Sequence, residues 1–404
     1  MSDRLVTLEE IRAAAERGKG VVMTTPLFPS STFSALAGCD ILMKAENQQR
    51  SGSFKIRGAM NALALLDDEK RRNGVVAASA GNHAQGVALA ATTLGIASTV
   101  FMPETAMIPK IDATRGYGAE VRLAGSNVGE ALDAAREFGE QTGAHLVHPY
   151  DDADIIAGQG TLGLELLEQA SDIGTIVVPV GGGGLISGVG AAVKAVNPSV
   201  RIVGVEASAT APYVASRQAG SPTDVEPRYT LADGIAVARA SALCFEHIEA
   251  FVDDLVTVDD GQMTEAVALL LERAKLLVEA SGAAPLAAML AGKVEPKPGA
   301  TVLILSGGNV DLLLLDQVIR HGLGAAGRFG TFAIRVPDVP GQLARVTRTI
   351  ADAGANVVSV HHQRQGIGLP FGFTEISFEV ETRSASELDA MCAALEAMGI
   401  GVIR

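Results

Sequence analysis

Residues Thr175–Gly188 have the sequence TIVVPVGGGGLISG, in which an apolar run leads into four glycines and then into a helical pattern. The run is short and rich in β-branched residues, as in a strand that is buried on both faces. Glycines at its carboxyl end let backbone amides wrap an anion, and the next helix adds the positive end of its dipole. The stretch therefore predicts a strand–loop–helix unit with an anion site at the loop.

The same alternation of short β-type runs and helical runs continues on both sides of this stretch. Strands that alternate with helices indicate parallel, doubly wound sheets, in which ligands bind where strands end and Gly-rich loops begin. The sequence therefore predicts an α/β fold. The other expected strands are Gly74–Ala78, Ala97–Met102, Ala119–Leu123, Arg201–Glu206 and Thr301–Leu305, and a helix is expected at Asn82–Leu94.

Length and composition limit the class of protein. A chain of 404 residues is too long for one compact core, and 48% apolar residues exclude a disordered chain. The net charge of -14 disfavours electrostatic binding to nucleic-acid polymers or anionic membranes. Cys39, Cys244 and Cys392 form no CxxC pair, and no signal-peptide or membrane-spanning run occurs. We therefore expect a soluble, cytoplasmic protein.

The composition changes near residue 320. Residues 321–328 are rich in Gly and Ala and are predicted to link a first domain, residues 1–320, to a second, residues 329–404. The second domain has the pattern β-α-β-β-α-β, which defines the ferredoxin-like unit. Its strands are expected at Thr331–Val336, Asn356–Gln363, Phe371–Glu381 and Ile400–Ile403, and Ser384 is expected to cap its second helix.

Lys55 is the residue whose placement is hardest to explain as ordinary surface chemistry. Ser53 is a candidate N-cap, which would put Lys55 in the first turn of a helix. The helix dipole disfavours a cation there and so lowers the pKa of the amine. A neutral amine is a nucleophile that forms a Schiff base with a carbonyl. The alternative for a lone lysine is a solvated surface side chain.

Three further loops follow predicted strands and open predicted helices. They are Ser79–His83, Gly181–Gly188 and Ser306–Asn309. Backbone amides at such loops make anion sites, to which Ser79 and Asn82 would add side-chain donors. Any single Gly-rich loop is equally well explained as a tight turn, but the conjunction of these loops with Lys55 is not.

Sequence motifs for other cofactors are either absent or lie in an unsuitable local sequence. The chain has no GxxxxGK[ST] for a nucleotide triphosphate and no HExxH for zinc. A GxGxxG occurs at Gly158–Gly163, but the acidic stretch before it is a poor strand, so a dinucleotide fold is a weak alternative. His83 alone favours a structural role, and His361 and His362 favour a strand pair. No metal is predicted, although Glu206 is left open as an ion ligand.

A lysine nucleophile, a Gly-rich phosphate loop and a small polar residue for a ring nitrogen together describe a pyridoxal phosphate (PLP) site. The four loops resemble those of threonine/serine dehydratases in the tryptophan-synthase-β-like, fold type II group of PLP enzymes, over about residues 5 to 320. Residues 329–404 resemble an ACT domain. The whole chain is similar to threonine ammonia-lyases (threonine dehydratases) with a single ACT domain. This implies two doubly wound subdomains, the smaller at about residues 50–150.

The resemblance implies roles for individual residues. Lys55 would hold PLP and act as the base at the substrate Cα, with Phe54 packed nearby. Asn82 would bond the 3-hydroxyl of the ring, and Ser306 would face the pyridine nitrogen. The phosphate would be bound by Gly181, Gly182, Gly183, Gly184 and Leu185, and the substrate by Ser79, Ala80, Gly81, Asn82 and His83. Ala232–Ile235 and Glu279 are expected to line the pocket.

The implied reaction is β-elimination and deamination of threonine to 2-oxobutanoate and ammonia, and of serine to pyruvate. Related serine racemases use a second serine as the base on the opposite face, at the position where this chain has Ala80. Alanine cannot transfer that proton, so racemisation is not expected. Their cation site also uses an acidic residue where this chain has Pro212.

The ACT resemblance implies allosteric regulation of a small-molecule enzyme. The expected effector contacts are Asp338, Gly341, Gln342, Leu343 and Asn356. For an enzyme of isoleucine biosynthesis the hypothesis is inhibition by isoleucine and relief by valine; threonine catabolism is the other role. The alternative is an oligomerisation module without a ligand. A homotetramer is implied by resemblance alone.

Two other functions stay open at this point. One is another fold type II PLP enzyme, such as a serine racemase or a threonine synthase. The other is a non-catalytic amino-acid sensor that keeps the fold. Retention of Lys55, Asn82 and Ser306 argues against the sensor, which would not need the cofactor lysine.

Overall fold

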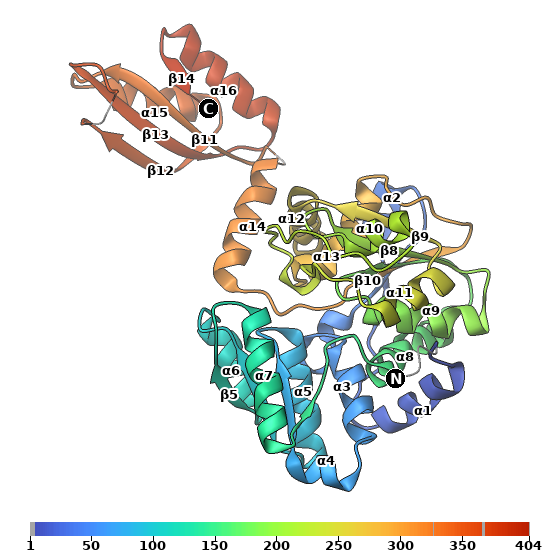
Figure 1. The fold of residues 1–404 in the computed structure, drawn as a ribbon. Helices are drawn as coiled ribbons and strands as arrows, with labels where there is room; N and C mark the ends of the chain where they lie inside the picture. Colours follow the sequence, from blue (N-terminus) through green and yellow to red (C-terminus); the bar gives the residue numbers. More distant parts are fainter. Residues whose placement is uncertain (1–4, 326, 366–367, 404) are drawn as a thin grey trace. The chain divides into compact units, whose positions relative to one another are not determined.

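The protein is described by a computed structural model that covers residues 5–325, 327–365 and 368–403. The chain forms two compact units that divide between Asp311 and Leu312. Figure 1 shows the ribbon with its elements labelled.

The first unit contains a six-stranded sheet with the order β1-β2-β10-β7-β8-β9. All neighbouring strands are parallel except β1 and β2, which are antiparallel. The strands are β1 (Leu27–Pro29), β2 (Ile41–Lys44), β7 (Ile173–Pro179), β8 (Arg201–Ala207), β9 (Asp254–Val258) and β10 (Ala300–Ile304). Every residue of β7 is buried, as its β-branched sequence predicts.

Helices cover this sheet, which confirms the doubly wound α/β prediction. They are α1 (Leu8–Gly18), α2 (Ser31–Ala37), α8 (Ala153–Gln169), α9 (Gly184–Val196), α10 (Pro212–Ala219), α11 (Ala242–Phe251), α12 (Asp260–Leu269) and α13 (Ala280–Leu290). The GxGxxG at Gly158–Gly163 lies inside α8, which packs on α9. A Cβ at Gly160 would lie 2.9 Å from the carbonyl oxygen of Gly188. These glycines therefore serve close helix packing, not a dinucleotide loop.

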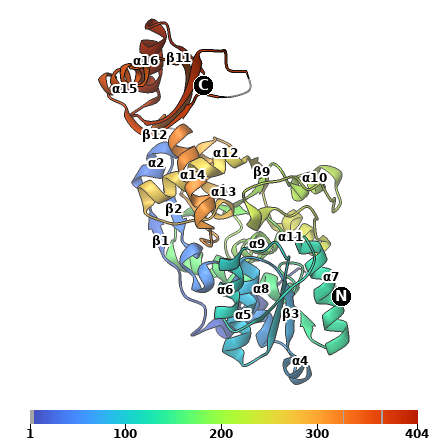
Figure 2. The ribbon, with the colours of Figure 1, turned by 90° about the vertical axis from the view of Figure 1, so that its left-hand side faces the viewer.

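A second, four-stranded parallel sheet lies in the same unit, with the order β5-β4-β3-β6. Its elements are β3 (Val75–Ala78), β4 (Ser98–Met102), β5 (Glu120–Leu123), β6 (His145–Leu146), α3 (Lys55–Ala64), α4 (Asp68–Asn73), α5 (Asn82–Leu94), α6 (Ile108–Gly116) and α7 (Val128–Thr142). Val75 and Ala77 of β3 pack with α3 and α5, whereas Val76 and Ala78 pack with α7. Figure 2 shows β3 between α5 and α7. Side chains that alternate along β3 therefore pack into two separate hydrophobic cores.

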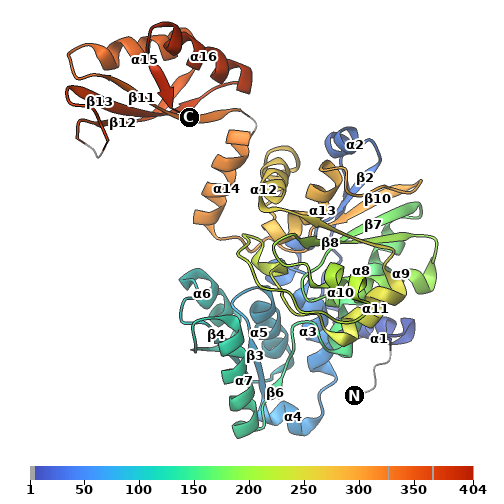
Figure 3. The ribbon, with the colours of Figure 1, turned by 45° about the horizontal axis from the view of Figure 1, so that its top comes forward.

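The second unit is the predicted β-α-β-β-α-β domain. It contains β11 (Phe329–Pro337), α15 (Gln342–Asp352), β12 (Asn356–Gln363), β13 (Phe373–Glu381), α16 (Ala385–Ala397) and β14 (Gly401–Ile403). The sheet is antiparallel with the order β12-β13-β11-β14. Figure 3 shows both helices on one face of it. Ser384 caps α16 through its side chain, as predicted.

The predicted linker is wrong over most of its length. Helix α14 (Leu312–Ala325) runs through residues 321–325, and the units divide before it. Alanine and the leucines at helical spacing outweigh two interior glycines there. The helix ends at Ala325, and Gly327 beyond it has φ +64 and donates its N–H to the Gly324 carbonyl. Residue 326 lies outside the described residues.

Candidate active site

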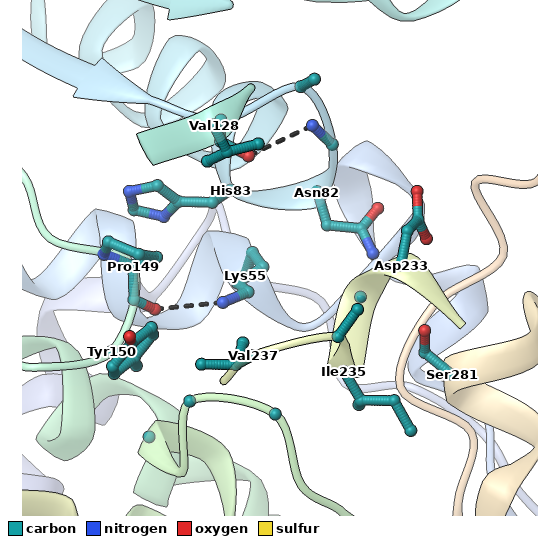
Figure 4. Close-up of a pocket in the computed structure, with 18 of the residues that line it drawn as sticks. Lys55, Asn82, His83, Val128, Pro149, Tyr150, Asp233, Ile235, Val237 and Ser281 are labelled. Atoms are coloured by element: carbon teal, nitrogen blue, oxygen red, sulfur yellow. Dashed lines mark hydrogen bonds between the residues drawn. The ribbon is translucent and has the colours of Figure 1, made fainter. Parts of the chain in front are cut away.

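A cavity of about 730 Å³ lies in the first unit and gathers the predicted loops. It is lined at the start of α3, at the loops after β3, β6, β7 and β10, and by the segment around Asp233. The predicted cofactor and substrate residues line it: Phe54, Lys55, Ser79, Ala80, Gly81, Asn82, His83, Gly181, Gly182, Gly183, Gly184, Leu185 and Ser306. Of the segment Ala232–Ile235, all but Ala232 line it, as does Glu279. Figure 4 shows how the side chains converge.

The Lys55 amine points into this cavity. Its Nζ donates to the carbonyl oxygen of Pro149 at 3.0 Å and lies 5.2 Å from the centre of the Phe54 ring (Figure 4). Removal from bulk water lowers the pKa of Lys55 to about 8, against the opposing charge of Glu279. A substantial fraction of the amine is therefore neutral, and nucleophilic, near neutral pH.

Ser53 is not the N-cap of this helix, contrary to the prediction. Phe54 occupies the cap position with helical backbone angles and makes no side-chain cap bond. Ser53 is extended instead and forms an isolated bridge with Gly307. Pairing with the loop after β10 thus outweighs capping, although Lys55 still begins the helix.

The Gly181–Leu185 loop is shaped so that only glycine fits at its centre. A Cβ at Gly182 would overlap the ring of Tyr150, and the carbonyl of Gly182 accepts a hydrogen bond from Tyr213 Oη at 2.7 Å. Gly183 is the N-cap of α9. The unpaired amides of a helix start and its dipole make this loop an anion-binding concavity.

The loop after β3 carries the predicted polar side chains. Ser79 Oγ accepts the N–H of Gly81 at 3.1 Å, which leaves its own O–H available as a donor. Asn82 begins α5, and its Nδ2 donates to Glu279 Oε1 at 2.7 Å. His83 lines the cavity with its Nε2 2.9 Å from the Val147 carbonyl, and burial lowers its pKa to about 3. His83 is therefore neutral.

Glu279 is the buried acid of the cavity, with 6% of its surface exposed. Burial, and then the charge of Asp233, raise its pKa to about 8. Asp233 in turn pairs with Lys110 at 2.6 Å, and both residues line the cavity. At neutral pH Glu279 is mostly protonated, so it can accept from Asn82 without placing a full negative charge beside Lys55.

Lys110 and the segment His148–Tyr150 also line the cavity but were not predicted from the sequence. That segment supplies the carbonyl that accepts from Lys55 and the ring that covers Gly182. It follows β6, a strand of two residues that is too short to show a period. The only sequence signal for this segment was that it follows a short β-type run, as the other loops of the cavity do.

In the second unit the structure brings together four of the five predicted effector residues. Asp338 and Gly341 lie in the turn between β11 and α15, and Gln342 and Leu343 begin α15. Asp338 lies 3.3 Å from Arg364. Asn356 begins β12 and pairs with Glu381, which pairs with Phe329 at the opposite end of β11. Nine residues of β11 separate the two places by roughly 30 Å. Within one chain Asn356 is not part of this group.

Two negative findings concern the described residues only. Among residues 5–325, 327–365 and 368–403 no group of three or more His, Cys, Asp and Glu side chains is placed to hold a metal ion. No helix in the described part of the chain is long and apolar enough to cross a membrane. Glu206 is buried and accepts the N–H groups of Tyr213 and Val214.

A lysine nucleophile and a helix-start anion site in the same cavity are the features of a PLP enzyme. Residues 19–307 match the family described as "Pyridoxal-phosphate dependent enzyme", and residues 331–390 match the ACT domain. The chain belongs to this family of pyridoxal-phosphate dependent enzymes and carries an ACT domain.

The chain is also similar to individual proteins whose activity is named. The chain is 45% identical to an L-threonine ammonia-lyase of Thermotoga maritima over 398 residues, which is 98% of this chain and 99% of that protein. Maize serine racemase superposes with a TM-score of 0.75 at 38% identity, covering 80% of this chain and 99% of that one. A processed threonine deaminase isoform of Solanum lycopersicum gives 0.73 at 35% identity, covering 78% and 86%.

The residues present fit the cofactor. The Gly181–Leu185 loop, called the cup below, would lose its shape with any side chain at Gly182. The buried Ser281 Oγ lines the same cavity and has no hydrogen-bond partner in the structure. Lys55, Asn82, Gly181–Leu185 and Ser306 are placed around the space that a PLP molecule would occupy.

Cofactor uptake should depend on the protonation of Lys55. Only the neutral amine attacks a carbonyl, so apoprotein should bind PLP about tenfold more slowly for each pH unit below about 8, and the rate should level off above it. Stopped-flow absorbance between pH 6 and 9 measures this. A rate that does not change across that range would contradict a lowered pKa for Lys55.

Proposed function

We propose that this protein is an L-threonine ammonia-lyase, which converts L-threonine to 2-oxobutanoate and ammonia and L-serine to pyruvate and ammonia. The observation that supports this most strongly is the Lys55 amine, with its lowered pKa, in one cavity with the Gly181–Leu185 cup. The near full-length similarity to an L-threonine ammonia-lyase supports the choice of substrate.

Bound PLP supplies an electron sink for negative charge that develops at the substrate Cα. In the proposal the amides of Gly181–Leu185 hold its phosphate, and Asn82 donates to its 3-hydroxyl. Ser306, which is 4% exposed and lines the cavity, would face its pyridine nitrogen. A serine hydroxyl does not keep that nitrogen protonated, so the sink is shallow and favours rapid loss of a β-leaving group.

Lys55 is the proposed base. Once freed, its amine can take the Cα proton, and the lowered pKa makes the unprotonated fraction that does so much larger than for an ordinary lysine. Ala80 lines the cavity in the loop after β3 and has no group that transfers a proton. We therefore propose a base on only one face of the substrate Cα. This gives elimination without racemisation, although the fold is shared with serine racemase.

A product assay tests this function. Holoprotein is incubated separately with L-threonine, L-serine and O-activated serines, and keto acids, ammonia and D-serine are quantified. The proposal expects keto acid and ammonia from threonine and serine, and no D-serine. Formation of D-serine would support a racemase, and a replacement product from activated serines would support a synthase.

The ACT domain is proposed to bind a small amino acid at the turn Asp338–Leu343. Isoleucine should reduce threonine turnover and valine should relieve that inhibition. Asp338→Ala should weaken the isoleucine effect at least about tenfold, because a charged hydrogen-bonding group is lost from the turn. Asp352→Ala, at the far end of α15, is the matched control. Equal isoleucine inhibition in the Asp338 variant and the wild type would reject the site.

A cytoplasmic location and a homotetramer belong to the same proposal. The thiols of Cys39, Cys244 and Cys392 are all free, which suits a reducing compartment. Light scattering of the full chain tests the tetramer.

A further inference from the structure

Asn309 joins three of the loops that line the cavity. It lies on the loop after β10, and its Nδ2 donates to the Ser51 carbonyl at 2.7 Å and to Asn82 Oδ1 at 2.8 Å. A longer contact of 3.3 Å runs to Gln85 Oε1. One amide thus connects the segment before Lys55, the start of α5 and its own loop.

These contacts fix the orientation of the Asn82 amide. Its oxygen accepts from Asn309, and one N–H of its Nδ2 is used by Glu279 Oε1 at 2.7 Å. An amide has two N–H donors, so the group that Asn82 keeps for a ligand is its second N–H. Asn82 therefore meets a ligand as a donor, which suits an oxygen that carries negative charge.

The segment before Lys55 is held in an unfavourable backbone conformation at the same place. Ser51 has φ +61, in the left-handed region that a residue with a side chain rarely adopts. Three bonds tie this segment to the loop of Asn309: its own bond to the Ser51 carbonyl, Gly308 N–H to the Gly52 carbonyl at 2.9 Å, and Phe54 N–H to the Ser306 carbonyl at 3.1 Å. Only the first of these uses a side chain.

We propose that Asn309 is a positioning residue, which sets Asn82 as a hydrogen-bond donor to the cofactor and seats the segment that presents Lys55. The inference rests on the proposed function, because it takes Asn82 as the donor to the 3-hydroxyl of PLP. Asn309 acts through Asn82 and Ser51. Its replacement should therefore change cofactor affinity and absorbance before it changes folding.

The test titrates apoprotein with PLP and follows the visible absorbance of the bound cofactor. Asn309→Asp keeps the size of the side chain but removes the donor to Asn82, so the Asn82 amide should rotate and offer its oxygen. The dissociation constant of PLP should rise at least about tenfold, with a shifted absorbance maximum. Asn309→Ala should show a smaller rise in the same direction.

A double-mutant cycle separates positioning from general stability. Because Asn309 acts in part through Asn82, the losses should not add: the double variant Asn82→Ala/Asn309→Ala should lose less PLP affinity than the two single losses combined. Asn47→Ala is the matched control, because Asn47 Nδ2 also donates to a backbone carbonyl, that of Leu277 at 3.0 Å, and Asn47 does not line the cavity. Its PLP affinity should stay within about twofold of the wild type.

Wild-type affinity and absorbance in Asn309→Asp would overturn the proposal, as would additive losses in the cycle or an equal loss in Asn47→Ala. If Asn309→Asp does not fold, the alanine cycle still decides the question. The titration uses no substrate, so a wild type that fails to turn over threonine would reject the proposed function and leave the role of Asn309 to be decided by affinity.

Discussion

Lys55→Ala should reduce threonine turnover by a factor of at least about 10⁴, because it removes the group proposed both to bind the cofactor covalently and to act as the Cα base. The visible absorbance of the bound cofactor should be lost as well. Steady-state keto-acid production and an absorbance spectrum at saturating PLP measure the two effects.

The same substitution should not destabilise the apoprotein. Folding lowers the pKa of Lys55 from 10.5 to about 8, so below pH 8 the folded state holds the protonated amine at a cost that is relieved as pH rises from about 8 toward 10.5. Removing the amine should leave the Tm of the apoprotein at pH 7 unchanged or higher. Lys70→Ala on α4 is the control, with unchanged turnover. Turnover within tenfold of the wild type in Lys55→Ala would refute both roles.

Gly182→Ala should weaken PLP binding roughly 10²-fold, because the new methyl group would overlap the Tyr150 ring and displace the amides proposed to bind the phosphate. Isothermal titration of apoprotein with PLP measures the loss. The cost in stability should be smaller, about 1–3 kcal/mol for an overpacked site.

Two variants control for this substitution. Gly116→Ala adds a methyl group where no atom lies within 4 Å, and PLP affinity should not change. Adding Tyr150→Ala to Gly182→Ala removes the ring and should recover part of the affinity. An unchanged affinity in Gly182→Ala would show that the loop does not hold the phosphate, and a double variant no better than Gly182→Ala would show that the Tyr150 ring is not the obstacle.

Local sequence predicted most of the catalytic unit because the relevant signals are short-range. The helix Asn82–Leu94 has the bounds that its apolar period indicated, and the glycine loop follows β7 as expected. Strand alternation also predicted that ligands bind at the loops where strands end, although the loops that line the cavity come from two sheets.

The parts that failed depend on long-range pairing. Ser53 has good capping chemistry, but its bridge to Gly307, more than two hundred and fifty residues away, holds it extended. Pro149 contributes only a backbone carbonyl to Lys55, which no side-chain pattern reports. Asn356 was grouped with Asp338, although the register of β11 with β13 puts them at opposite ends of the sheet.

In the proposed function, Lys55 takes the Cα proton of threonine and the Gly181–Leu185 cup holds the cofactor phosphate. The most direct measurement is the simultaneous yield of 2-oxobutanoate and ammonia from L-threonine by purified, PLP-loaded protein. The account predicts equal molar amounts of both products, formed over many turnovers. A PLP-loaded protein that binds L-threonine and forms neither product would contradict it.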